Sequence, residues 1–211
     1  MTVHAREPFA ADESVLRAAL RPARTPAPRP VALYPAGAEI FAQGERPGKL
    51  YQVEFGTVRV YRLLSDGRRQ IAAFYLVGEV FGFEAGDTRR FFAEAIAETA
   101  VRVIAAATSD SAQMLPLALK TLAAAQEHLL VLGRQSATER VAGFLLDLSQ
   151  RQGRMDIDLP MTRTDIADYL GLTMETVSRA LSKLKADRVI RLRGARNVDI
   201  LAAKALRRMV E

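Results

Sequence analysis

The pattern of hydrophobic and polar positions changes along the 211-residue chain and predicts a strand-rich segment followed by a helical one. Within residues 31–103, apolar positions alternate with period two at 50–54, 57–64 and 69–76, and eight of the thirteen glycines fall here. Such alternation with frequent glycine turns is typical of antiparallel strands in a barrel or jelly roll. The Ser-Asp-Gly sequence at 65–67 predicts the turn of a β-hairpin.

After Asp110 the pattern becomes helical, with apolar or small residues at alternating spacings of three and four, and predicts one long helix over 109–136. So narrow a seam is typical of a coiled-coil interface between two copies of a chain. We therefore expect a homodimer whose interface contains Leu115, Ala118, Leu122, Ala125, Leu129, Leu132 and Ser136. The other interpretation is an ordinary core helix packed on its own barrel, because Gly133 interrupts the pattern. Pro116 fits either the first turn of this helix or a kink within it.

Residues 162–165, Thr-Arg-Thr-Asp, have the form of a capping box. The hydroxyl of Thr162 can accept a hydrogen bond from the amide of Asp165, and the Asp165 carboxylate can accept one from the amide of Thr162. We expect a helix to begin there and to end at Gly171, which permits the left-handed turn that closes a helix.

A second short helix is expected directly afterwards, capped by Thr173 and apolar on one side. Its other side carries Glu175, Ser178, Arg179 and Lys183. Two short helices joined by a glycine turn, the second with polar residues at its exposed N-terminal end, predict a helix-turn-helix. Residues 189–192 and 198–201 are interpreted as two strands around a turn, which form a wing.

The net charge of +6 is concentrated near one end of the chain. Residues 175–208 hold ten Lys or Arg against three acids, a balance of +7, so the rest of the chain carries −1. An excess of one sign beside a helix-turn-helix is expected for a protein that binds a polyanion such as DNA. The other interpretation of this segment is a merely basic surface.

The composition, 49% hydrophobic and 26% charged, is that of a globular protein and excludes several kinds of site. Without cysteine there is no disulfide framework, thiolate zinc site, iron–sulfur cluster or redox thiol. His4 and His128 lie too far apart in sequence for us to expect a multi-histidine metal centre. The chain opens without an apolar stretch of signal-peptide length, and no later segment approaches the roughly 18 apolar residues that span a bilayer. We therefore expect a cytoplasmic protein with no membrane partner.

The stretch TRTDIADYLGLTMETVSRALSKLKADRVI resembles the DNA-binding domain of the cyclic-AMP receptor protein and fumarate-nitrate reductase regulator (CRP/FNR) superfamily. The stretches AQEHLLVLGRQSATERVAGFLLDL, LYPAGAEIFAQGE and VGEVFGFEAG are similar to its FixK-like branch. The resemblance covers roughly residues 31–205. It implies an α+β fold with an N-terminal cyclic-nucleotide-binding-type β-roll (jelly roll), a long dimerisation helix and a C-terminal winged helix-turn-helix. We accordingly expect an N-terminal arm at 1–30, a sensor-like β-roll at 31–108, the dimerisation helix at 109–136 and the DNA-binding domain at 137–211.

In that branch the recognition helix carries a Glu-x-x-Ser-Arg signature, which here falls on Glu175, Ser178 and Arg179. A glutamate can accept a hydrogen bond from cytosine N4, and an arginine can donate two to guanine O6 and N7. The resemblance implies a palindromic operator of the TTGAT-N4-ATCAA type. The other interpretation of Glu175 and Arg179 is a surface ion pair one helical turn apart. Phosphate contacts or helix caps, which position a protein without reading sequence, are expected at Thr162, Arg163, Thr173, Thr176, Lys183, Arg193 and Arg196.

The β-roll departs from the pattern of those relatives that bind cyclic nucleotides. They hold the ribose with a Gly-Glu pair and the cyclic phosphate with an Arg-Ser/Thr-Ala run, whereas here Gly82 is followed by Phe83, and Arg89-Arg90 by two phenylalanines. We expect Arg89 and Arg90 to be surface charges facing the long helix, and we expect no cofactor. The pocket is expected to be filled by Phe81, Phe83, Phe91 and Phe92.

The leading hypothesis is a homodimeric, sequence-specific DNA-binding transcriptional regulator, an activator rather than an enzyme, that needs no effector. The resemblance implies a contact with RNA polymerase, for which residues 65–69 are a candidate. The alternative is a ligand-gated regulator that binds DNA only with haem, a nucleotide or another small molecule in its β-roll. A haem ligand could come from His4, His128 or a methionine, although we expect His128 to be a partly exposed helical residue. A cupin-like metal enzyme is disfavoured because histidine is nearly absent.

Overall fold

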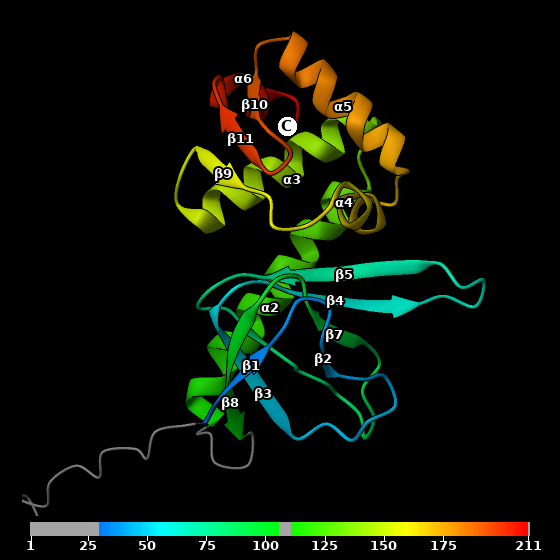
Figure 1. Ribbon diagram of the computed structural model, residues 1–211, viewed down its shortest axis with the longest axis vertical. Coiled ribbons are helices and arrows are strands. Elements are labelled where there is room, and N and C mark those ends of the chain that lie inside the picture. Colours follow the sequence, from blue (N-terminus) through cyan, green and yellow to red (C-terminus); the bar gives the residue numbers. More distant parts are fainter. Residues whose placement is uncertain (1–29, 106–110, 211) are drawn as a thin grey trace, which may run out of the picture.

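The computed structural model describes residues 30–105 and 111–210. The expected arm at 1–30 lies outside the described residues except for its last position. In Figure 1 the strands of the N-terminal half form the lower body, α2 runs along that body, and the C-terminal helices and strands form the upper body.

The N-terminal half is a β-roll of two antiparallel four-stranded sheets, ordered β1-β8-β3-β6 and β2-β7-β4-β5. Aromatic and branched apolar side chains from both sheets fill the space between them, as period-two alternation requires. The predicted jelly roll is confirmed, and the turn expected at 65–67 lies between β4 and β5. The strands are β1 (Val31–Tyr34), β2 (Glu39–Phe41), β3 (Lys49–Phe55), β4 (Val58–Leu63), β5 (Arg69–Tyr75), β6 (Val80–Phe81), β7 (Phe92–Ala95) and β8 (Thr99–Ala105).

Two helices connect the halves, α2 (Ser111–Leu132) and α3 (Ala137–Gln152). The helix predicted over 109–136 is shorter than expected at its C-terminal end. Ser136 lies outside α2 because it caps α3 instead: its Oγ accepts a hydrogen bond from the Glu139 amide at 3.1 Å, and Glu139 completes a capping box. Pro116 lies inside α2.

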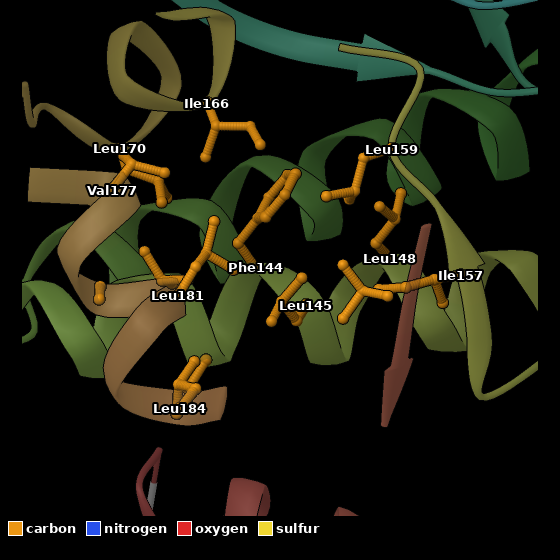
Figure 2. Close-up of a cluster of buried hydrophobic side chains, with 14 of the residues drawn as sticks. Phe144, Leu145, Leu148, Ile157, Leu159, Ile166, Leu170, Val177, Leu181 and Leu184 are labelled. Atoms are coloured by element: carbon orange, nitrogen blue, oxygen red, sulfur yellow. The ribbon is translucent and has the colours of Figure 1, made fainter. Parts of the chain in front are cut away.

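The C-terminal half packs α3, α4 (Arg163–Leu170) and α5 (Met174–Ala186) against a small antiparallel sheet ordered β10-β11-β9. The three strands are β9 (Asp156–Asp158), β10 (Ile190–Arg193) and β11 (Asn197–Ile200), and α6 (Ala203–Arg208) follows. Figure 2 shows the apolar side chains of these elements converging around Phe144 and Leu145 of α3. The same buried cluster continues into Ile71 and Phe74 of β5, so the two halves share a core.

The exposed side of α2 corrects one expectation. Met114–Leu132 spans 19 residues with a mean hydropathy of 1.2 and none of it buried, so by length and composition alone this helix could cross a membrane. The prediction that no segment approaches this apolar length is therefore wrong. The cause is the alanine- and leucine-rich composition, in which Lys120 and Glu127 are the only charges.

Candidate nucleic-acid interface

The first helix of the helix-turn-helix, α4, begins and ends as its sequence predicts. Thr162 Oγ1 accepts a hydrogen bond from the Asp165 amide at 3.1 Å, and Asp165 Oδ2 accepts one from the Thr162 amide at 2.9 Å. Gly171 closes the helix with a φ of +63°, in the left-handed region that glycine adopts without strain. Thr162 is thus a capping residue whose exposed position leaves it beside any DNA phosphate that approaches the helix N-terminus.

The second helix, α5, is held by an apolar face and presents a polar one. Its N-cap is Thr173, whose Oγ1 accepts a hydrogen bond from the Thr176 amide at 3.2 Å. The buried face consists of Val177, Ala180, Leu181 and Leu184, three of which are labelled in Figure 2. The opposite face is exposed to solvent and carries Glu175, Ser178, Arg179 and Lys183.

Glu175 and Arg179 are not joined by an ion pair in the described chain, although they lie one helical turn apart. Hydrogen bonds from its own amide and from the Thr173 hydroxyl, with the charge of Arg179, lower the pKa of Glu175. The carboxylate is therefore ionised at neutral pH and can act as an acceptor. Both side chains are exposed and available to an external partner.

The wing, β10 and β11, contains arginines that an internal acid partly neutralises. Asp199 pairs with Arg191 at 2.7 Å and with Arg193 at 2.7 Å. The phosphate contact expected at Arg193 therefore competes with this pair. Arg163 is half-buried and donates a hydrogen bond to the Ala195 carbonyl at 3.3 Å, so it joins the start of α4 to the wing turn.

Between the start of α5 and the turn of the wing, five cations remain exposed, and no ion pair within the described residues involves them. They are Arg179, Lys183, Lys185, Arg188 and Arg196. Together they leave the surface around the recognition helix electropositive, and this is the charge that a phosphate backbone requires.

Two arginines of the β-roll also reach this domain, and the pattern of the sequence did not reveal them. Arg59 of β4 and Arg69 of β5 both donate to Asp165, at 2.8 Å and 2.6 Å. Arg69 is therefore half-buried and held by two acids, which leaves it less available than its neighbours for the polymerase contact expected at residues 65–69. The turn before it, including Asp66 and Arg68, is exposed.

Arg89 lies inside the β-roll, contrary to the expectation of a surface charge. Its side chain is 3% exposed, donates hydrogen bonds to the carbonyls of Lys49 at 2.9 Å and Gly82 at 3.3 Å, and lies 3.7 Å over the ring of Phe41. These carbonyls and the ring satisfy the guanidinium, which explains its burial. Arg90 is exposed as expected.

The phenylalanines expected to fill the pocket have separate positions. Phe81 is fully buried in the β-roll core, and Phe92 stacks on Tyr61 with ring centroids 5.3 Å apart, in the other sheet. Phe83 and Phe91 line a cavity of about 730 Å³ between the β-roll, α2 and α3, which the aromatic side chains leave open. His128 of α2 also lines this cavity and is half-buried. Within residues 30–105 and 111–210, no group of three or more His, Asp or Glu could hold a metal ion.

The seam predicted on α2 is largely exposed in the single chain. Leu115 is 60% exposed, Leu122 54% and Leu129 66%, and Ala125 is exposed too. Ala118 and Leu132 are half-buried, at the margin of this face. Two further exposed leucines, Leu119 and Leu130, widen the apolar face beyond the predicted seam. The core-helix interpretation would require the chain's own β-roll to cover this face, and strands β1–β8 leave it exposed.

Comparison with known proteins also divides the chain into an N-terminal β-roll and a C-terminal helix-turn-helix domain. The Crp-like helix-turn-helix domain matches residues 139–209, and the cyclic nucleotide-binding domain matches residues 32–116. The nitrogen fixation regulation protein FixK of Rhizobium meliloti (strain 1021) is 56% identical over 191 residues, which are 89% of this chain and 90% of that protein. The FixK protein of Azorhizobium caulinodans is 44% identical over 216 residues, 95% of this chain and 85% of that protein. The solved structure of FixK2 from Bradyrhizobium japonicum has a TM-score of 0.80 and 42% identity, covering 86% of this chain and 96% of that one.

Proposed function

The chain belongs to the FixK-like branch of the CRP/FNR superfamily of DNA-binding transcriptional regulators, and on this premise we propose a homodimeric activator that needs no small-molecule effector. Its family consists of regulators and not of enzymes. The operator we propose is a palindrome of the TTGAT-N4-ATCAA type, read by Glu175, Ser178 and Arg179. We also propose that it acts in the cytoplasm, where DNA and RNA polymerase are found.

The exposed polar face of α5 carries this proposal. Glu175 and Arg179 project from adjacent turns of a helix whose back is fixed in the core, and neither is bound by an ion pair. An ionised carboxylate and a guanidinium so placed can recognise a C·G pair in the major groove. The capped N-termini of α4 and α5 and the exposed Lys183 and Arg196 would then lie on phosphates.

The exposed leucines of α2 support the proposed dimer. A face this apolar, on a helix that residues 30–105 and 133–210 leave exposed, is stabilised when a second copy covers it. Two copies related by a twofold axis would place their recognition helices in successive major grooves about 34 Å apart, matching a palindrome. The exposed turn at Asp66 and Arg68 is the surface we propose for RNA polymerase.

The bonds of Arg89 support independence from a cyclic nucleotide. An arginine that holds a bound phosphate must be free to do so, but here Lys49, Gly82 and Phe41 already bind the guanidinium. Extending Arg89 to a ligand would break these interactions and expose the buried carbonyls. These contacts therefore support a β-roll that needs no ligand at this position.

The cavity of about 730 Å³ favours a second candidate function, a ligand-gated regulator. Its volume is that of a small-molecule site, and its lining combines an apolar majority with polar and charged groups such as Lys120, Glu127 and His128. An obligate effector would have to bind the DNA-competent state far more tightly than the other state. Protein without ligand would then bind its operator weakly.

A fluorescence-anisotropy titration separates the two candidates. Purified, ligand-free protein is titrated at physiological salt onto a TTGAT-N4-ATCAA duplex and a scrambled duplex, with cyclic AMP or haemin added in parallel series. Nanomolar binding with at least a thousandfold preference, unchanged by either additive, supports the effector-independent regulator. Weak and unselective binding by the ligand-free protein contradicts it.

A further inference from the structure

We propose that Arg59 and Arg69 of the β-roll are positioning residues for DNA binding, because they clamp Asp165 and so fix the orientation of the helix-turn-helix. In this clamp the N-terminal domain holds the first turn of α4 by charge-assisted hydrogen bonds. The inference rests on the proposed function and specifies how the β-roll serves it.

The two oxygens of the Asp165 carboxylate accept hydrogen bonds from different partners. Oδ2 accepts hydrogen bonds from the amide of Thr162 at 2.9 Å and from its hydroxyl at 2.8 Å, which caps α4. Oδ1 accepts from Arg59 Nη1 at 2.8 Å and from Arg69 Nη2 at 2.6 Å. A cap alone needs only the first oxygen, so the second one is available to hold the other domain.

The clamp is shielded from water. The side chain of Asp165 is 1% exposed, and those of Arg59 and Arg69 are 17% and 22% exposed. Burial alone would raise the pKa of Asp165, but the bonds from Thr162 and the two arginine charges outweigh it and lower that pKa. Charged groups buried in this way interact much more strongly than exposed pairs and keep a defined geometry.

Each arginine is also held by a second acid, which fixes its direction. Arg59 pairs with Glu94 of β7, its neighbour within the sheet. Arg69 donates from Nε to Asp168 Oδ2 at 2.9 Å, and Gln70 donates to the Asp168 carbonyl at 2.7 Å. Both turns of α4 that face the β-roll are therefore bound, and Figure 1 shows β4 and β5 extending beneath this helix.

The bound turn is also the turn that the proposed function places on DNA. Thr162 is exposed beside Asp165, and Arg163 holds the Ala195 carbonyl of the wing at 3.3 Å. The α4 helix and the recognition helix share the core of Figure 2, in which Ile166 and Leu170 pack with Val177. A change in the direction of α4 therefore moves the recognition helix and the wing with it.

The consequence concerns the spacing between the two half-sites. In a dimer joined through α2, the distance between the recognition helices depends on how rigidly each helix-turn-helix is attached to its β-roll. A helix-turn-helix freed from the clamp would still read its own half-site but would tolerate a wrong spacer. Folding defects alone would lower binding to every spacer alike.

The experiment compares Arg69→Ala with Arg68→Ala on duplexes whose half-sites are separated by three, four or five base pairs. Arg68 is the matched control, because it is the adjacent arginine but is 77% exposed and pairs only with Asp66. We expect the wild type and Arg68→Ala to prefer the four-base-pair spacer. In Arg69→Ala, the ratio of the affinities for the four-base-pair spacer and the other spacers should fall at least tenfold, while the preference for the half-site sequence is kept. Arg59→Ala should act in the same direction, and Arg69→Lys should restore part of the preference. An unchanged spacer preference in Arg69→Ala overturns the clamp.

A second measurement keeps this test independent of DNA. The chain has no cysteine, so nitroxide labels can be attached at Gln43→Cys on the β-roll and Lys185→Cys on α5, both exposed positions. Labelled chain is mixed with excess unlabelled chain so that most dimers carry one label pair. We expect Arg69→Ala to broaden the distance distribution and Arg68→Ala to leave it narrow; equal widths in a folded Arg69→Ala protein overturn the clamp. If the wild type fails to prefer the palindrome over scrambled DNA, the proposed function fails while this measurement still tests the clamp.

Discussion

His128 of α2 and Tyr169 of α4 stack face to face, with ring centroids 3.8 Å apart and ring planes 14° from parallel. His128 Nδ1 is buried and has no hydrogen-bond partner, and burial lowers the pKa of His128 to about 4. The stack joins the long helix α2 to α4 of the helix-turn-helix. Protonation of His128 would therefore place a positive charge at the contact between these two helices.

This junction is predicted to weaken as the pH falls from about 6.5 to about 4. In that window the unfolded chain binds a proton at His128 that the folded chain does not, so the free energy of unfolding decreases by at most about 1.4 kcal/mol per pH unit. The slope should lie below this limit because the ring is only partly buried. Urea unfolding at several pH values measures it. His128→Phe keeps a ring against Tyr169 and should remove this part of the slope; an identical pH dependence in the two proteins would contradict the assignment.

Asp165→Asn is predicted to lower the free energy of unfolding by about 2 kcal/mol, because it removes the charge shared by two half-buried guanidinium groups, each of which keeps one other acid. Asp66→Asn, at an exposed hairpin turn, should stay within about 0.5 kcal/mol of the wild type. Since the pKa of Asp165 is lowered, its contribution is present above the unfolded value of 3.8 and is lost as the pH falls below it. Equal free energies of unfolding for Asp165→Asn and Asp66→Asn at neutral pH would show that the clamp contributes little to stability.

Arg188, between α5 and β10, has a φ of +56°, in the left-handed region that glycine adopts more readily than other residues. Arg188→Gly is predicted to raise the free energy of unfolding by up to about 1 kcal/mol. Arg188→Ala removes the same charge but keeps the Cβ, so it should bring no gain. Urea unfolding of the pair separates backbone strain from charge. If Arg188→Ala were stabilised as much as Arg188→Gly, the loss of charge and not the relief of backbone strain would be the cause.

Leu122→Glu is predicted to convert the proposed dimer into monomers, because it places a charge in the middle of the exposed apolar face of α2. Sedimentation equilibrium should show the dissociation constant rising at least a hundredfold. Leu33→Glu is the control, since Leu33 is 74% exposed and belongs to β1 instead of α2. Leu119→Glu should resemble Leu122→Glu if the face extends as the exposed leucines indicate. A variant at Leu122 that stays dimeric would place the interface elsewhere.

The features that the sequence predicted correctly are local ones. The capping box of Thr162 and Asp165, the left-handed Gly171 and the Thr173 cap each depend on residues within a few positions, so their spacing reveals them. The same holds for the period-two strands, because each strand shows its buried face in its own pattern.

The missed features depend on contacts between distant residues. Arg59 meets Asp165 across 106 positions, and no local pattern relates a strand arginine to a helix cap. Arg89 looked like a surface charge because its acceptors are backbone carbonyls, which a sequence does not display. The wider apolar face of α2 had a visible signal, since Leu119 lies one turn from Leu115 and beside Leu122.

The proposed reading of bases by the exposed face of α5 is tested most directly by a comparison of Arg179→Ala with Lys183→Ala. Lys183 is a better control for a phosphate contact than Arg193, because Arg193 already pairs with Asp199 at 2.7 Å. Both variants are titrated by fluorescence anisotropy onto the TTGAT-N4-ATCAA palindrome and a scrambled duplex over a range of salt concentrations. Arg179→Ala should lose about 1 to 3 kcal/mol on the palindrome alone and relax the preference for guanine, whereas Lys183→Ala should weaken both duplexes alike and flatten the salt dependence. Equal losses on both duplexes in Arg179→Ala would contradict the base-reading role of this face.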